Sequence, residues 1–226
     1  WKDTSLSLYH RWLNHLLKLQ QQQYPLPIFH VLLKNIQENP AFEHFRLVDG
    51  TALALQFGHR KSIDLDFFGD ISFDTINFEA ELTNLGEVQN LMGRRSIRTY
   101  SINGIKVDFV QYPYPWIGEK ITEDGVTMAD LKDISAMKMA AITNRGAKKD
   151  FFDLHLLFDH FSLKEIVSNY LKKYHDASVF LLYKSLSYFE EAEEDDDPEV
   201  LNNTTWDQIK DRIRAEHKAY MDELEL

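Results

Sequence analysis

Two segments of the chain alternate apolar and acidic residues with the period of a β-strand. The first, residues 62–68, carries Asp64 and Asp66 between apolar side chains, and the second, residues 105–110, carries Asp108 in the same way. Because residues i and i+2 of a strand point to the same side, each segment has one acidic face and one apolar face. If the two strands are neighbours in a sheet, three carboxylates converge.

The first half of the chain mixes helical and strand patterns. Apolar spacing predicts helices at 5–20, 28–38, 51–57 and 78–85. Strand-like runs lie at 45–48, 64–68, 87–92, 96–102 and 105–111. Asn103-Gly104 is a strong hairpin signal, so we expect the last two strands to be antiparallel and the sheet to be mixed.

From Asp130 onward the pattern is helical. Helices are predicted at 130–145, 148–160, 163–173, 176–189 and from about 205. Residues 127–130 resemble a capping box, and the acidic run at 190–197 is interpreted as a solvated loop. We therefore expect an α+β fold of two parts. Residues 1–128 form a core with a mixed sheet and N-terminal helices, and residues 129–226 form a helical region packed on it.

Composition excludes several classes of protein. The 226 residues are 44% apolar and include no cysteine, which does not suggest a disulfide framework. No apolar run approaches the ~20 residues that span a bilayer. The sequence does not open with a charged segment followed by an apolar one, the pattern of an export signal. We therefore expect a cytoplasmic protein without a membrane segment. The net charge of −11 disfavours a protein that mainly coats nucleic acid, although basic clusters lie at 59–61, 94–98 and 145–149.

Gly50-Thr51 lies at a predicted strand-to-helix turn before the first acidic strand. A glycine there lets a phosphate approach the main chain, and a helix N-terminus offers N–H groups and a favourable dipole. A plain turn with a threonine cap is the alternative. Three converging carboxylates suggest a bound Mg²⁺ or Mn²⁺. For an Asp-x-Asp pair considered alone, the alternative is that both aspartates simply face solvent from a strand.

Lys138 occupies a position that the helical pattern reserves for an apolar side chain. It shares one stripe with Leu131, Ile134 and Ile142. A buried ammonium needs an anion, such as a nucleotide phosphate, whereas a lysine at the edge of the stripe extends to solvent. Asp150 and Asp153 fall one turn apart at the start of the next helix, where acids also serve the helix dipole.

In this order the motifs resemble those of the AbiEii/AbiGii-type nucleotidyltransferase toxins, of the DNA polymerase β-like nucleotidyltransferase superfamily. The matching segments are 47–55, 58–62, 64–68, 106–109, 133–138, 145–146 and 149–154. The resemblance implies a polymerase β-like nucleotidyltransferase core, a nucleoside triphosphate (NTP) substrate and a Mg²⁺ or Mn²⁺ cofactor.

The resemblance also implies roles for individual residues. Asp64, Asp66 and Asp108 are catalytic acids that bind metal, and Asp108 helps to activate the acceptor hydroxyl. Nucleotide contacts are implied for Gly50, Thr51, Arg60, Ser62 and Lys138, with Lys138 on the β- or γ-phosphate. Asp150 is the preferred match for a late functional acid. The family commonly has glycine where this chain has Asp49, whose charge either opposes the triphosphate or joins the metal shell.

We therefore expect a Mg²⁺-dependent enzyme that moves a nucleoside monophosphate from an NTP to an acceptor hydroxyl. By the resemblance, the acceptor is RNA or tRNA, and the enzyme is the toxin of a toxin-antitoxin or phage-defence system with a cognate antitoxin. Two alternatives are transfer to a small molecule or a protein, and a catalytically silent domain that binds a nucleotide or a partner.

Overall fold

The computed structural model describes residues 26–73 and 78–224, so the helix predicted at 5–20 lies outside the described residues. The chain divides into two compact units. The first comprises the described residues up to Tyr114 together with Lys120–Ala129. The second comprises Pro115–Glu119 and the described residues from Asp130 onward. None of the helices in these ranges is long and apolar enough to cross a membrane.

The first unit contains a seven-stranded mixed sheet, in the order β3-β4-β5-β2-β1-β7-β6 within the described residues. The strands are β1 (Phe45–Leu47), β2 (Leu65–Gly69), β3 (Val88–Arg94), β4 (Ile97–Ile102), β5 (Ile105–Gln111), β6 (Ile121–Glu123) and β7 (Val126–Met128). The helices are α2 (Leu26–Glu38), the 3-10 helix η1 (Pro40–Phe42), α3 (Asp49–Phe57) and α4 (Phe78–Thr83). Strands β2 and β5 are parallel, as are β1 and β7, while the other pairs are antiparallel. The predicted α+β class and mixed sheet are confirmed.

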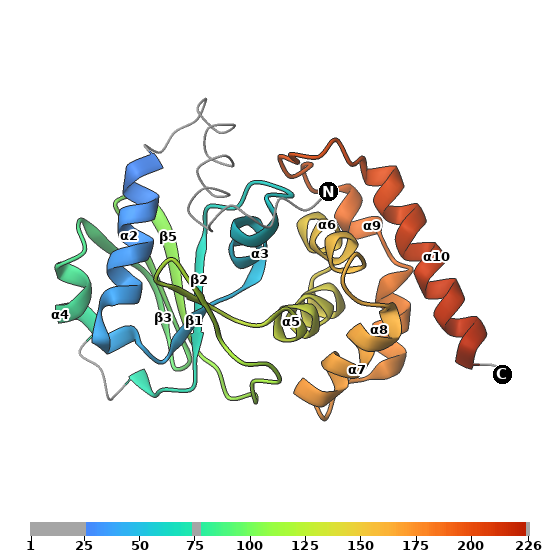
Figure 1. The fold of residues 1–226 in the computed structure, drawn as a ribbon, viewed down its shortest axis with the longest axis horizontal. Coiled ribbons are helices and arrows are strands. Elements are labelled where there is room, and N and C mark those ends of the chain that lie inside the picture. Colours follow the sequence, from blue (N-terminus) through green and yellow to red (C-terminus); the bar gives the residue numbers. More distant parts are fainter. Residues whose placement is uncertain (1–25, 74–77, 225–226) are drawn as a thin grey trace. The chain divides into compact units, whose positions relative to one another are not determined.

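The apolar face of the sheet buries an aromatic cluster. Phe67 of β2 stacks on Phe109 of β5 with 5.4 Å between ring centroids, and Phe109 also meets Phe42 of η1 and Phe78 of α4. Each such pair contributes about 0.5–1.5 kcal/mol beyond the burial of its area. Figure 1 shows α2 and α4 on one side of the sheet and α3 on the other. Since side chains alternate along a strand, the residues next to Phe67 and Phe109 face α3.

The hairpin between β4 and β5 forms where Asn103-Gly104 predicts it. Both residues have positive φ, 51° and 83°, as a two-residue turn of this kind requires. The Asn103 side chain also accepts a hydrogen bond from the Glu87 N–H at 2.9 Å, which ties the turn to the start of β3. The antiparallel pairing of β4 and β5 is thereby confirmed.

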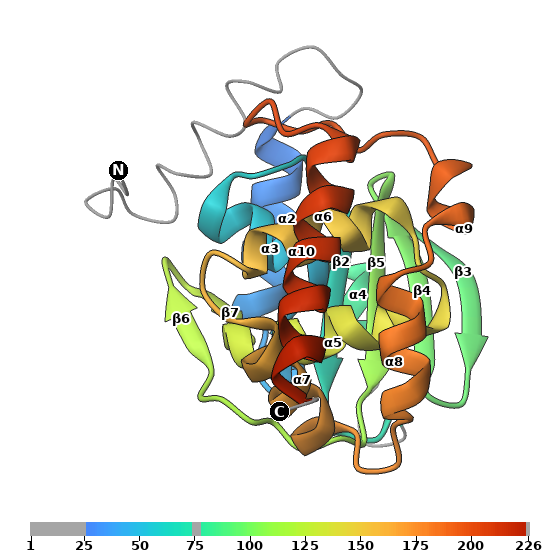
Figure 2. The ribbon, with the colours of Figure 1, turned by 90° about the vertical axis from the view of Figure 1, so that its right-hand side faces the viewer.

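The second unit consists of helices around α5. Its helices are α5 (Leu131–Asn144), α6 (Lys148–Leu157), α7 (Leu163–Lys173), α8 (Val179–Leu186), α9 (Glu190–Glu193) and α10 (Trp206–Leu224). Helix α5 contacts α6, α7 and α8, and α10 crosses α6 and α7, as Figure 2 shows. The most amphipathic of these sequences is that of α7, which begins at a capping box formed by Ser162 and Glu165.

One prediction about local structure is wrong, and a second is only partly right. The capping box predicted at residues 127–130 does not form, because Thr127 lies in β7 and Asp130 alone caps α5, accepting from the Lys132 N–H at 2.8 Å. The acidic run is not simply a solvated loop, because it includes α9 and its end is held by Lys148. The Lys148 main-chain N–H donates to Asp195 at 2.8 Å, and its ammonium pairs with Asp197 at 3.0 Å.

Candidate active site

Asp66 and Asp108 lie side by side on the two central parallel strands. They are register partners in the β2–β5 pair, and Asp64 immediately precedes β2. We call Asp64, Asp66 and Asp108 the acid cluster. The Lys106 ammonium pairs with Asp108 Oδ2 at 2.6 Å. Asp108 Oδ1 is buried and has no hydrogen-bond partner among the described residues.

The acid cluster repels its own negative charge. Burial, followed by the charge of Asp49, raises the pKa of Asp66 to about 7, and the charges of Asp108 and Asp64 add to the rise. The Lys106 ammonium acts in the opposite direction but does not offset them. The structure thus places Asp66 and Asp108 in register on adjacent strands, with Asp64 one residue before β2, and a cation would offset the charge that raises the pKa of Asp66.

The donor set and the unpartnered oxygen suit a hard divalent cation. Mg²⁺ and Mn²⁺ prefer carboxylate oxygens, and all three members of the acid cluster supply them. Asp108 Oδ1 is a buried acceptor that lacks a donor within the described residues. A buried acceptor of this kind carries a desolvation cost that a bound cation would remove. The residues present therefore fit the cofactor that the sequence predicts.

Gly50 makes room for a buried arginine. A Cβ atom added at Gly50 would lie 2.0 Å from Nη2 of Arg60, whose side chain is 4% exposed. Arg60 also donates through Nη1 to the Lys61 carbonyl at 2.9 Å. The absence of a side chain at Gly50 thus lets a guanidinium lie against the first turn of α3, close to the main-chain N–H groups there.

Thr51 holds the segment that leads into β2. Thr51 is 1% exposed, and its hydroxyl donates to the Asp64 carbonyl and shares a 2.9 Å hydrogen bond with Ser62 Oγ. The side chain of Thr51 is therefore engaged within the protein, and it fixes the position of Asp64 relative to α3. Gly50, Thr51, Arg60 and Ser62, all predicted to contact the nucleotide, lie together at this turn.

Lys138 is fully buried, as its place on the apolar stripe of α5 predicts. Its anions come from the chain itself, because Nζ lies 3.0 Å from Asp150 and 2.6 Å from Asp153, both also fully buried. Arg145 adds two hydrogen bonds to Asp150, at 2.9 and 3.1 Å. Burial alone would raise the pKa of Asp150, but the charge of Lys138 and then Arg145 outweigh it, so this pKa lies below its ordinary value.

A second buried ion pair in the same unit was not predicted. Lys173 of α7 lies 2.6 Å from Asp133 of α5, and both side chains are fully buried. Asp133 also accepts from the N–H groups of Ile117 and Gly118, at 2.9 and 2.8 Å. The pair therefore anchors the segment Pro115–Glu119 to α5 and α7.

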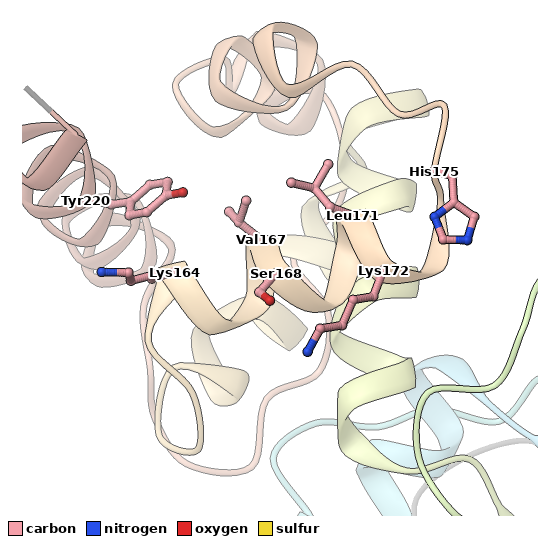
Figure 3. Close-up of a pocket in the computed structure, with 7 residues that line it drawn as sticks. All are labelled: Lys164, Val167, Ser168, Leu171, Lys172, His175 and Tyr220. Carbon is pink, nitrogen blue, oxygen red and sulfur yellow. The ribbon is translucent and has the colours of Figure 1, made fainter.

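A groove of about 500 Å³ lies between α7 and α10. Figure 3 shows Lys164, Ser168 and Lys172 along α7 and Tyr220 on α10 at its edges. Lys164 is paired with Glu223 at 3.0 Å. The groove holds none of the residues that the sequence predicts for the active site.

Comparison with known proteins identifies the family. Residues 31–225 match the family described as nucleotidyl transferase AbiEii toxin, type IV toxin-antitoxin (TA) system. The chain belongs to the AbiEii family. This confirms the predicted resemblance, which rested on separate short segments between residues 47 and 154.

Other proteins are similar to this chain over most of its length. An uncharacterized protein of Aquifex aeolicus, aq_aa25, is 34% identical over 184 residues, which cover 79% of this chain and 88% of that protein. A putative nucleotidyltransferase from Helicobacter pylori has a similar fold, with TM-score 0.59, 18% identity and coverage of 94% and 96% of the two chains. MenT4, a nucleotidyltransferase toxin from Mycobacterium tuberculosis, matches with TM-score 0.58, 14% identity and coverage of 83% and 79%.

Proposed function

We propose that this chain is a divalent-metal-dependent nucleotidyltransferase that transfers a nucleoside monophosphate from an NTP to a hydroxyl of RNA, and that it acts as the toxin of a toxin-antitoxin pair. The observation that carries the proposal is the register of Asp66 and Asp108 on adjacent strands, with a buried oxygen of Asp108 left without a donor in the described part of the chain. Membership of the AbiEii family supports the reaction class and a protein antitoxin as partner.

The acid cluster would hold Mg²⁺ or Mn²⁺. The cation, when bound, would offset the negative charge of the phosphates and of the carboxylates around it. Because burial and like charges raise the pKa of Asp66 to about 7, the carboxylates bind a cation most strongly when that proton is absent. We therefore expect activity to rise with pH across neutrality.

Asp108 is proposed to accept the proton of the acceptor hydroxyl. Its Oδ2 is paired with Lys106, whereas Oδ1 has no donor within the described residues. In the reaction the acceptor oxygen forms a bond to the α-phosphorus, the bond from that phosphorus to the bridging oxygen breaks, and pyrophosphate leaves. The hydroxyl proton passes to Asp108, so charge and atoms balance.

The turn at Gly50 is proposed to bind the triphosphate. The first N–H groups of α3 and the buried guanidinium of Arg60 lie at the same turn, and both attract phosphate oxygens. Thr51 and Ser62 position this turn through their shared hydrogen bond. Positioning and charge stabilisation are the main sources of rate in phosphoryl transfer, which suits a site without a strong nucleophile of its own.

In the second unit, Lys138 is proposed to hold α5 to α6 through Asp150 and Asp153 rather than to reach a substrate phosphate, because its side chain is fully buried. The proposal is supported by the burial of Lys138 and by its two carboxylate partners, which keep an ammonium charged inside the protein. Asp150 then has a structural role in the same ion pair.

A labelling experiment tests the function. The protein is incubated with Mg²⁺, each α-³²P-labelled NTP and total RNA, and the RNA is resolved on a denaturing gel. Label in an RNA band, absent with EDTA and with Asp64→Ala, is the expected result. Label in protein or in small molecules instead of RNA would contradict the proposed acceptor, and no transfer despite NTP binding would contradict the enzyme assignment.

A further inference from the structure

The row of paired residues that contains Asp66 and Asp108 continues across the sheet into β4 and β3. Thr99 of β4 is the register partner of Asp108, and Met92 of β3 is the register partner of Thr99. Because directly opposed residues of neighbouring strands point to the same side of a sheet, Thr99 and Met92 share the face of the two aspartates. With about 4.8 Å between strands, Met92 lies roughly 10 Å from Asp108 along this row.

The outer end of the row is exposed. Within the described residues β3 is an edge strand, and Figure 2 shows it beyond β4. Leu91 and Met92 are 56% and 44% exposed. The register shifts between Asn90 and Met92, so Leu91 is an extra residue that bulges from the strand. Two neighbouring large apolar side chains on an edge strand offer a surface to another molecule.

The turn from β3 to β4 adds positive charge to this surface. Arg94 lies two residues after Met92, and therefore on the same face, and Arg95 follows it in the turn. Both arginines are exposed, and neither guanidinium has a hydrogen-bond or ion-pair partner in the part of the chain that the structure describes. Arg98 instead faces the other side of the sheet, over the Phe73 ring at 4.9 Å. The two arginines are thus available to an anionic ligand.

We propose that Leu91, Met92, Arg94 and Arg95, here called the hairpin surface, dock the acceptor RNA. The arginines bind its phosphates, and the apolar pair lies against a base. This inference rests on the proposed function, because it supplies that reaction with a site for the acceptor strand. The acceptor hydroxyl reacts beside Asp108, at the inner end of the row, so the nucleotides next to it reach the hairpin surface at the outer end.

Charge favours RNA as the occupant of the hairpin surface. The chain has a net charge of −11, which repels a polyanion, so RNA binding needs a local concentration of positive charge near the acid cluster. Guanidinium groups bind phosphate oxygens in a bidentate geometry, and burial of Leu91 and Met92 against a base removes apolar area from water. A second copy of the chain would bring the same two arginines against each other.

Salt-dependent RNA binding tests the role of the arginines. The full chain is titrated with a fluorescein-labelled single-stranded RNA of mixed sequence, without NTP and in EDTA, and anisotropy is recorded between about 50 and 200 mM KCl. Arg94→Gln with Arg95→Gln should weaken binding about tenfold. Each lost phosphate contact reduces the slope of log K against log salt by about 0.7, so the double variant should lose about 1.4. Arg94→Lys with Arg95→Lys keeps both charges and should keep the slope.

Lys120 offers a matched control at the opposite edge of the sheet. It is exposed and directly precedes β6, which ends the sheet on the other side from β3 within the described residues. Lys120→Gln removes one positive charge, as Arg95→Gln does. Arg95→Gln should lose about 0.7 of the salt slope, whereas Lys120→Gln should change neither the slope nor the affinity.

The labelling reaction separates docking from chemistry. In Arg94→Gln with Arg95→Gln the acid cluster is intact, so most of the loss in kcat/KM should lie in a KM for RNA that rises about tenfold. A fall in kcat with an unchanged KM for RNA would overturn the inference, because the arginines would then act on the reaction and not on docking.

The outcomes separate this inference from the proposed function. Weaker binding with a smaller slope in the glutamine variants, and not in Lys120→Gln, supports it. Unchanged binding in the glutamine variants, or equal loss in Lys120→Gln, overturns it, and label that still enters RNA leaves the proposed function standing. Label in protein or small molecules overturns both. A dimer in size-exclusion chromatography with light scattering, lost in Leu91→Asp, would assign the strand to a second copy and overturn the inference.

Discussion

At the scale of single residues, Gly50 matters because its lack of a side chain leaves room for the guanidinium of Arg60. Gly50→Ala would place a methyl group where Nη2 of Arg60 lies, 2.0 Å from the new Cβ atom. The guanidinium ends a flexible side chain and can move, and alanine favours a helix by up to about 1 kcal/mol, so we expect unfolding stability to change by less than about 1 kcal/mol. Nucleotide affinity should fall about tenfold, measured by calorimetry with a non-hydrolysable NTP analogue.

Gly58 provides the control for this substitution. It ends α3 with φ 60°, and nothing lies within 4 Å of a Cβ atom added there. Gly58→Ala should therefore cost about 1 kcal/mol of stability through backbone strain and leave nucleotide affinity unchanged. If Gly50→Ala binds the analogue as tightly as the unmodified protein does, Arg60 is not a phosphate ligand.

The raised pKa of Asp66 predicts an unusual pH dependence of stability. Its folded pKa of about 7 exceeds the ordinary value of 3.8, so the folded state holds this proton more tightly than the unfolded state. Without metal, the free energy of unfolding should fall as pH rises from about 4 to about 7. Asp66→Asn should remove this slope and stabilise the metal-free protein at pH 8, on the order of 1–3 kcal/mol.

Urea unfolding in EDTA at several pH values from 5 to 8 measures the effect. Asp70→Asn is a suitable control, because Asp70 is exposed just after β2 and its charge is not among those that raise the pKa of Asp66. A slope that persists in Asp66→Asn would show that other groups cause it.

Local rules predicted the acidic face of each strand, whereas the pairing of β2 with β5 was only a condition in the sequence argument and is seen in the structure. The period of a strand places Asp64 and Asp66 on one side, and the Asn103-Gly104 turn fixes the direction of the strand that carries Asp108. The approach of Arg60 to Gly50 and the positive φ of Asp49 depend on how the loop before β2 folds back. No periodicity in the sequence encodes such a contact.

At the scale of elements, Lys138 couples α5 to α6. Its ammonium contacts Asp150 and Asp153, and Lys138→Met would keep a similar length while leaving two buried carboxylates with less positive charge. Removing one partner of a buried ion pair costs about 3–5 kcal/mol. We expect a loss of that size in the free energy of unfolding at pH 7, measured by urea denaturation.

A double substitution tests whether charge is the cause. Lys138→Met with Asp153→Asn removes one positive and one negative charge, so it should be more stable than Lys138→Met alone. The pKa of Asp150 lies below its ordinary value, so its stabilising contribution is present at neutral pH and is lost as pH falls below about 4. Equal stability of the single and double variants would argue for lost packing instead.

Periodicity found a buried lysine but not its partners. Lys138 stood out because it interrupts an apolar stripe. In the same way, Lys173 lies on the buried face of α7, which is otherwise formed by apolar or aromatic residues such as Leu163, Ile166 and Tyr170. The same argument would have found Lys173. The acids that neutralise the two lysines lie on other helices, at distances in sequence that no helical period relates.

At the scale of the whole molecule, each unit has its own core. The sequence indicated a core built on a sheet and a core built from helices, but it missed some of the shortest strands and helices. Strands β6 and β7 have three residues each and were not predicted, although β1, which is equally short, was. The acidic run looked like solvated chain because its counter-charge, Lys148, lies far earlier in the sequence. Net charge described the average surface and carried no information about the acid cluster.

A cation bound by the acid cluster should stabilise the first unit specifically. Because a ligand that binds only the folded state adds RT ln(1 + [L]/Kd), Mn²⁺ at 100 times its Kd should add about 2.7 kcal/mol to the free energy of opening. Hydrogen–deuterium exchange, read by mass spectrometry on peptides from β2 and β5, measures this as slower exchange. In Asp108→Asn the same concentration of Mn²⁺ should add no protection. Absence of added protection in β2 and β5, or equal protection in Asp108→Asn, would contradict a metal site at these strands, since their paired acids are where the charge that needs neutralising lies.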